Sequence, residues 1–108
     1  MKISIHTSSM MENLIITIDS DKHLFRFNGE EVNLNIKLFC MRLINITNKW
    51  PSEFKPFAGL DCEKYNITIQ SNSGKTRTLY SNGLLPDNYK EFKKLIEEAK
   101  NARLTIQR

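Results

Sequence analysis

The chain has 108 residues, of which 40% are hydrophobic and 26% are charged. A chain of this length supports a single hydrophobic core, so we expect one domain spanning residues 1–108. The composition is that of an ordinary globular protein, and it excludes an intrinsically disordered or collagen-like chain.

The formal net charge of +4 is spread unevenly along the chain. Residues 1–54 hold six basic and six acidic side chains, whereas residues 55–108 hold ten basic and six acidic ones. A basic C-terminal half permits contact with nucleic acid or with an acidic protein, but it requires neither.

Cys40 and Cys62 are the only cysteines. A small secreted disulfide scaffold carries more, so a reducing compartment is favoured and we expect a cytoplasmic protein. The chain opens without a run of signal-peptide length, and no stretch is apolar enough to span a membrane. No membrane association is therefore expected.

Residues 2–7, 13–19 and 23–27 alternate apolar and polar side chains, which predicts three β-strands. Asn28-Gly29 follows the third strand. This pair is the strongest short-range hairpin signal, because both residues tolerate the positive φ that a type I′ turn requires. A brief returning strand at residues 31–34 is therefore expected.

From about residue 33 to residue 49 the apolar spacing changes to that of a helix. Asn33 or Asn35 is expected to cap its start, and Pro51 prevents it from continuing past Trp50. The core stripe recurs at steps of three and four and consists of Ile36, Phe39, Leu43, Ile46 and Trp50.

Leu38 and Met41 lie on the side of this helix away from the stripe. If the second helix packs near Cys40 and Ile44, both can stay exposed, and an exposed Leu/Met patch is typical of a partner-binding surface. The alternative is that residues 51–60, which include two phenylalanines, fold back and cover them.

Residues 65–70 and 75–80 predict a hairpin around Gly74, and a second helix follows. Asn88 with Glu91 three residues later is a capping-box arrangement. The buried face of this helix is expected to consist of Tyr89, Phe92, Ile96 and Ala99. The order β-β-β-α-β-β-α predicts an α+β fold, with a single antiparallel sheet of about five strands and two helices on one face.

The sequence contains only weak matches to catalytic, phosphate-binding or metal-binding motifs. Ser73-Gly74-Lys75-Thr76 resembles the end of a phosphate-binding loop, but it lacks the first glycine and precedes a strand, so a turn is the simpler interpretation. His6 and His23 are expected to face solvent without metal-ligand spacing, and Cys62 has no histidine nearby in sequence. We therefore expect a non-enzymatic protein with no metal and no cofactor.

Two strands loosely resemble sheet surfaces that stack nucleic-acid bases. Phe25 and Phe27 flank Arg26, and Arg77 and Tyr80 lie on another strand. Phe25 and Phe27 nevertheless share one face, which fits a core more simply, and the aromatic-and-glycine motif of such domains is absent.

From residue 60 to residue 98 the chain resembles a recurrent, uncharacterised type of small bacterial domain. That type has an Asp-Gly-x-x-Trp-like strand entry, a hairpin with a basic strand, and a Gly-x-Asn-x-x-Pro-x-Asn-aromatic segment opening a helix. The matching residues are Asp61, Tyr65 in place of Trp, Ser81, Leu84, Pro86, Asn88, Tyr89 and Phe92. Cys62 and Ser81 stand where glycine is usual. The resemblance implies the α+β fold and supplies no activity, although some such domains look like immunity proteins of toxin systems.

The sequence thus predicts a protein of bacterial or phage origin that binds another protein, as an immunity-type or inhibitor module. The alternative is a nucleic-acid-binding module that uses the basic C-terminal half. The predicted partner-binding residues are Leu38, Met41, Arg77, Lys90, Lys93 and Lys94.

Overall fold

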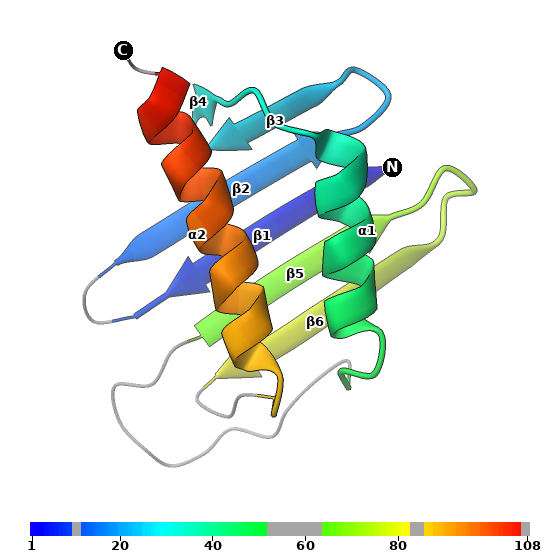
Figure 1. Cartoon of the computed structure of the whole chain (residues 1–108). Helices are drawn as coiled ribbons and strands as arrows, with labels where there is room; N and C mark the ends of the chain where they lie inside the picture. The colour runs from blue at the N-terminus through cyan, green and yellow to red at the C-terminus, as the bar shows by residue number, and fades with distance from the viewer. Residues whose placement is uncertain (10–11, 52–63, 83–85, 107–108) are drawn as a thin grey trace.

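A computed structural model of the chain describes residues 1–9, 12–51, 64–82 and 86–106. These residues form one antiparallel sheet with two helices on one of its faces (Figure 1). The predicted α+β class is therefore confirmed. The elements are, in chain order, β1 (Lys2–Ser8), β2 (Asn13–Asp19), β3 (Leu24–Phe27), β4 (Glu30–Glu31), α1 (Ile36–Thr47), β5 (Lys64–Gln70), β6 (Thr76–Asn82) and α2 (Tyr89–Ile106).

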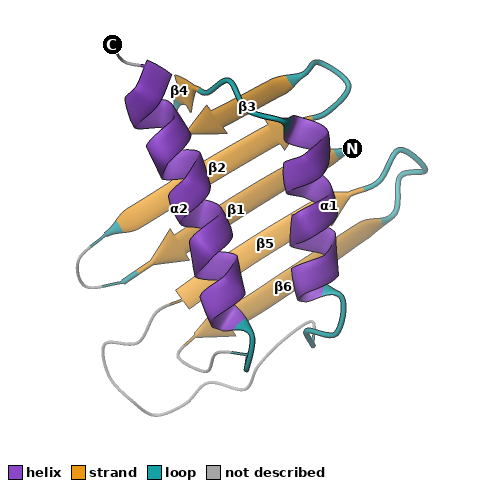
Figure 2. Ribbon diagram, in the orientation of Figure 1, coloured by secondary structure: helices purple, strands orange, loops and turns teal. Residues whose placement is uncertain are grey.

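The six strands lie in the order β4-β3-β2-β1-β5-β6. The first four strands form a meander, and α1 then carries the chain across the sheet so that β5 pairs with β1. Figure 2 shows that α1 runs from β3 toward β6 and that α2 runs back from β6 toward β4. The two helices are therefore antiparallel neighbours across the strands.

The returning strand after the third strand is real, but it is shorter and earlier than predicted. Asn28 and Gly29 have φ values of 49° and 84°, as the Asn-Gly turn requires, and β4 contains only Glu30 and Glu31. His23 also differs from the prediction. It precedes β3 in a turn with φ of 52°, so the strand begins at Leu24.

Alternation along each strand separates a buried face from an exposed one. In β1, for example, Ile3 and Ile5 are buried under the helices, whereas Lys2, Ser4 and His6 are exposed on the other face. The largest fully buried apolar side chains are Tyr65, Phe25, Phe27, Phe92, Ile5, Ile16, Leu43, Ile67, Leu79 and Leu95. The core thus lies between the sheet and one layer of helices.

Helix α1 begins where one of the two candidate caps predicts. The Asn35 side-chain oxygen accepts a hydrogen bond of 3.0 Å from the Leu38 main-chain N–H. Of the predicted stripe, Phe39, Leu43 and Trp50 are buried, and the other two residues are partly buried.

Helix α2 begins at Tyr89, but the expected capping box does not form. The Asn88 side-chain oxygen accepts a bond of 2.6 Å from the Trp50 indole N–H, and its amide donates 2.8 Å to the Ile46 carbonyl. Glu91 N–H donates instead to the main-chain carbonyl of Asn88 at 3.1 Å. Asn88 therefore joins the start of α2 to the end of α1.

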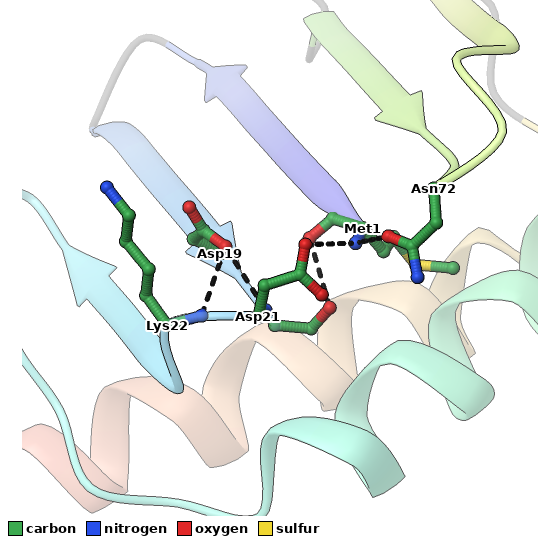
Figure 3. A network of polar contacts seen from close by, with 6 residues as sticks. Met1, Asp19, Asp21, Lys22 and Asn72 are labelled. Carbon is green, nitrogen blue, oxygen red and sulfur yellow. Dashed lines mark hydrogen bonds and ion pairs between the residues drawn. The ribbon is translucent and has the colours of Figure 1, made fainter.

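The first residue ties together two turns at one end of the sheet (Figure 3). The amino group of Met1 donates to the Asn72 side-chain oxygen in the β5–β6 turn and lies 3.6 Å from the Asp21 carboxylate in the β2–β3 turn. Asp19 stabilises the second turn by accepting from the main-chain N–H groups of Asp21 and Lys22, at 3.1 and 3.3 Å.

Candidate interaction surface

Leu38 and Met41 are exposed on the outer side of α1. Their exposed fractions are 49% and 54%, although both are large hydrophobic side chains in the middle of an ordered helix. They lie three residues apart, so they are neighbours on the helix surface. The predicted Leu/Met patch therefore exists, whereas the segment proposed to cover it lies largely outside the described residues.

The packing that leaves this patch exposed differs from the prediction. Helix α2 lies against the side of α1 that carries Phe39 and Arg42, and not the side near Cys40 and Ile44. A groove of ≈ 220 Å³ runs between the two helices beside Leu38. Its lining is Leu34, Asn35, Leu38, Phe39, Arg42, Leu95, Glu98 and Ala99.

An ion pair joins the two helices across this groove. The Arg42 guanidinium donates two hydrogen bonds to the Glu98 carboxylate, at 2.9 and 2.6 Å. The bidentate bond holds the pKa of Glu98 below its usual value and raises that of Arg42. Because both side chains are substantially exposed, the pair orients the groove wall and adds little to stability.

Three predicted lysines lie on α2. Lys90 and Lys94 are exposed and Lys93 is partly buried. Lys93 and Lys94 also line a second hollow of ≈ 440 Å³, together with Arg42, Glu97, Glu98 and Asn101. The outer surface of the helix layer therefore combines an apolar patch on α1 with lysines on α2.

Arg77, another predicted partner-binding residue, is hydrogen-bonded within the protein. Its side chain points into the helix layer and donates to the carbonyl oxygens of Thr47 at 2.5 Å and Trp50 at 3.3 Å. These bonds engage its donors at the end of α1, and contact of Arg77 with a partner stays a prediction. Strand alternation indicates this inward position, because Arg77 lies on the same strand face as the buried residues Leu79 and Ser81.

The predicted nucleic-acid surface also divides between two faces. Phe25 and Phe27 are fully buried in the core, whereas Arg26 and Tyr80 are exposed on the sheet face away from the helices. Among the described basic residues of the C-terminal half, Arg77 caps α1 and Lys100 pairs with Glu12 at 3.1 Å, so these two are engaged within the protein.

The other residues considered for catalysis, phosphate binding or metal binding lie as follows. His6 is exposed on β1, and Gly74 has the positive φ (89°) of a turn between two strands. Cys40 is buried, which raises the pKa of its thiol, and Cys62 lies outside the described residues. Within the described ranges, no three His, Cys, Asp or Glu side chains are grouped to hold a metal ion. None of the helices described there is long and apolar enough to cross a membrane.

The fold and this surface define a two-layer α+β protein with an apolar patch and a charged groove on its helix layer. No known protein family, curated protein or solved structure matches the chain. The resemblance of residues 60–98 to a small bacterial domain therefore stays a prediction.

Proposed function

We propose that the protein is a non-enzymatic, intracellular binding module that recognises another protein through its helix layer. The observation that carries this proposal is the exposure of Leu38 and Met41, at 49% and 54%, side by side on α1. Leu and Met side chains adapt their shape to a partner, and an exposed group of them is typical of a protein-interaction surface.

The surroundings of the patch support the same interpretation. The groove beside Leu38 gives a partner a concave site with apolar and charged walls, and Lys93 and Lys94 line the neighbouring hollow, which shares Arg42 and Glu98 with it. Interfaces commonly combine an apolar centre with a polar rim in this way. An immunity-type or inhibitor role in a bacterium or phage fits such a surface, because these roles need binding and no chemistry.

The proposal is tested by affinity capture from a lysate of the organism that encodes the protein. The wild type is compared with the double variant Leu38→Asp/Met41→Asp, which places two charges in the patch. The matched control is Ile15→Asp, because Ile15 is 48% exposed on the opposite face of the sheet. Circular dichroism verifies that each variant is folded.

We expect the wild type and Ile15→Asp to retain a partner in stoichiometric amount, and the double variant to lose it. Either of two results contradicts the proposal: no stoichiometric partner with the wild type, or equal recovery with the double variant. Nucleic-acid binding is the second candidate function, and the observation that favours it lies on the other face of the sheet.

A further inference from the structure

The sheet face opposite the helices is exposed over most of its width. Neither of the described helices lies on it (Figure 1). The strand register aligns its side chains in rows that cross the strands. One row consists of Arg26, Thr17, Ser4, Thr68 and Thr78, from β3 to β6. Cross-strand partners have Cβ atoms about 5 Å apart, so four hydroxyl groups stand in a line beside one guanidinium.

This face is hollowed along that row. A depression of ≈ 380 Å³ is lined by side chains from four strands, including Lys2, Ser4, Thr17, Arg26, Thr68 and Gln70. The lining combines two cations and the carboxylate of Asp19 with hydroxyl and amide groups that both donate and accept hydrogen bonds. A ligand that carries negative charge and many hydrogen-bonding groups matches this set.

Two carboxylates, those of Asp19 and Glu31, also belong to this face, and each has neighbours within the protein. Asp19 accepts hydrogen bonds from two main-chain N–H groups of the following turn, at 3.1 and 3.3 Å (Figure 3). Glu31 is the cross-strand partner of Arg26 on the short edge strand β4. Lys2, Arg26 and Lys64 are all exposed, so positive groups lie both at the hollow and at the far end of β5.

The next row offers a surface for a planar group. It consists of Ile15, His6, Asn66 and Tyr80, and Tyr80 is 38% exposed on the last strand of the sheet. Four strand spacings separate β3 from β6, or roughly 19 Å. The cationic hollow and the tyrosine are therefore separate contact points on one continuous surface.

We propose that this open sheet face binds single-stranded nucleic acid, with phosphates at Lys2 and Arg26 and a base stacked on Tyr80. Phosphate contacts to Lys and Arg provide affinity, and base stacking on an aromatic ring is tolerant of sequence. The hydroxyl and amide rows suit unpaired bases, whose edges are free to hydrogen-bond. In a duplex those edges are paired with the opposite strand, so only the contacts between the cations and the phosphates would remain. This site is independent of the proposed protein-binding surface on the helix layer.

Fluorescence polarisation with labelled oligothymidine and oligouridine of about 12 nucleotides tests the proposal. Titrations are run between about 50 and 200 mM salt, because each phosphate contact to a single strand adds about 0.7 to the slope of log affinity against log salt. We expect saturable binding that is at least ten-fold tighter than binding to a duplex hairpin of the same length.

Two sets of variants locate the site. Lys2→Gln/Arg26→Gln is expected to weaken binding at least ten-fold and to lower the salt slope by about 1.4. Tyr80→Val keeps a strand-forming residue and is expected to weaken binding at least five-fold with the slope unchanged. Lys90→Gln/Lys94→Gln removes the same charge from the helix layer and is expected to leave affinity within two-fold.

Three outcomes overturn the proposal. The first is no saturable binding at the lowest salt. The second is a loss with Lys90→Gln/Lys94→Gln as large as that with Lys2→Gln/Arg26→Gln, which places contact on the helix layer. The third is equal affinity for the duplex, which marks attraction to phosphate alone. None of these results bears on the capture experiment, so the two proposals can fail separately.

Discussion

The guanidinium of Arg77 in β6 donates a hydrogen bond of 2.5 Å to the main-chain carbonyl of Thr47, the last residue of α1. Carbonyl groups in the last turn of a helix have no partner within the helix, and α1 has no basic residue of its own there. A cation at this end also favours the helix dipole. The strand thus supplies the C-terminal cap that α1 lacks.

Replacing Arg77 by alanine is expected to lower the free energy of unfolding by about 2 kcal/mol, because a charged hydrogen bond to a partly buried carbonyl is lost. Urea denaturation measures the change. Arg26→Ala is the matched control: it lies at an exposed position of the same sheet and is expected to change stability by less than about 0.5 kcal/mol. Equal effects of the two variants contradict the capping role.

Asn88 is expected to matter as a bridge between two helices and not as a helix cap. Asn88→Ala leaves the Trp50 indole N–H and the Ile46 carbonyl without their partner, at a cost of about 2 kcal/mol. Serine caps helices as well as asparagine does, but it is too short to bridge. Asn88→Ser is therefore expected to be as unstable as Asn88→Ala.

Denaturation followed by the fluorescence of Trp50, the single tryptophan, checks this prediction. Trp50 is buried and packs against Tyr65, Tyr89 and Phe92, with ring centroids 5.1 to 6.2 Å apart. Loss of the indole hydrogen bond is expected to alter the emission of the folded state as well. Full recovery of stability in Asn88→Ser contradicts the bridge and restores the capping interpretation.

The Tyr65 hydroxyl is buried and has no hydrogen-bond partner among the described residues. Burial raises the pKa of this group from 10.0 to about 12. The folded state therefore keeps its proton where the unfolded state loses it, so stability is complete below pH 10 and falls as the pH rises from 10 to 12.

Tyr65→Phe is expected to be at least as stable as the wild type at pH 7, because it removes a buried polar group that no described residue satisfies. It is also expected to lose part of the decline in stability between pH 10 and 12. Urea unfolding of both proteins at a series of pH values measures this. A marked loss of stability at pH 7 would show that the hydroxyl has a partner after all.

The Arg42–Glu98 pair is expected to contribute less than about 1 kcal/mol at pH 7, because both groups are substantially exposed. The pKa of Glu98 is lowered from 4.5 by Arg42, so the contribution is present above pH 4.5 and is lost as the pH falls through the lowered value. The difference in unfolding free energy between wild type and Glu98→Gln should shrink at acid pH and at high salt. A difference that grows on acidification contradicts this assignment.

Much of the fold could be predicted because its signals are local. Alternation located the strands, the Asn-Gly pair located the β3–β4 turn, and Asn35 and Pro51 bounded the first helix. Each of these features depends on sterics or hydrogen bonds within a few residues, so each can be predicted from the local sequence. Exposure of Leu38 and Met41 was one of the two alternatives that their position off the core stripe left open.

The strand order, the side of α1 that meets α2 and the roles of Arg77 and Asn88 depend on tertiary structure. Arg77 donates to residues 30 and 27 positions earlier, and Asn88 to one 42 positions earlier. No local pattern states which distant carbonyl a long side chain will reach, because that depends on how the layers pack. The 108 residues thus determine two helices and a sheet by themselves, and only their packing decides which polar groups are left for a partner.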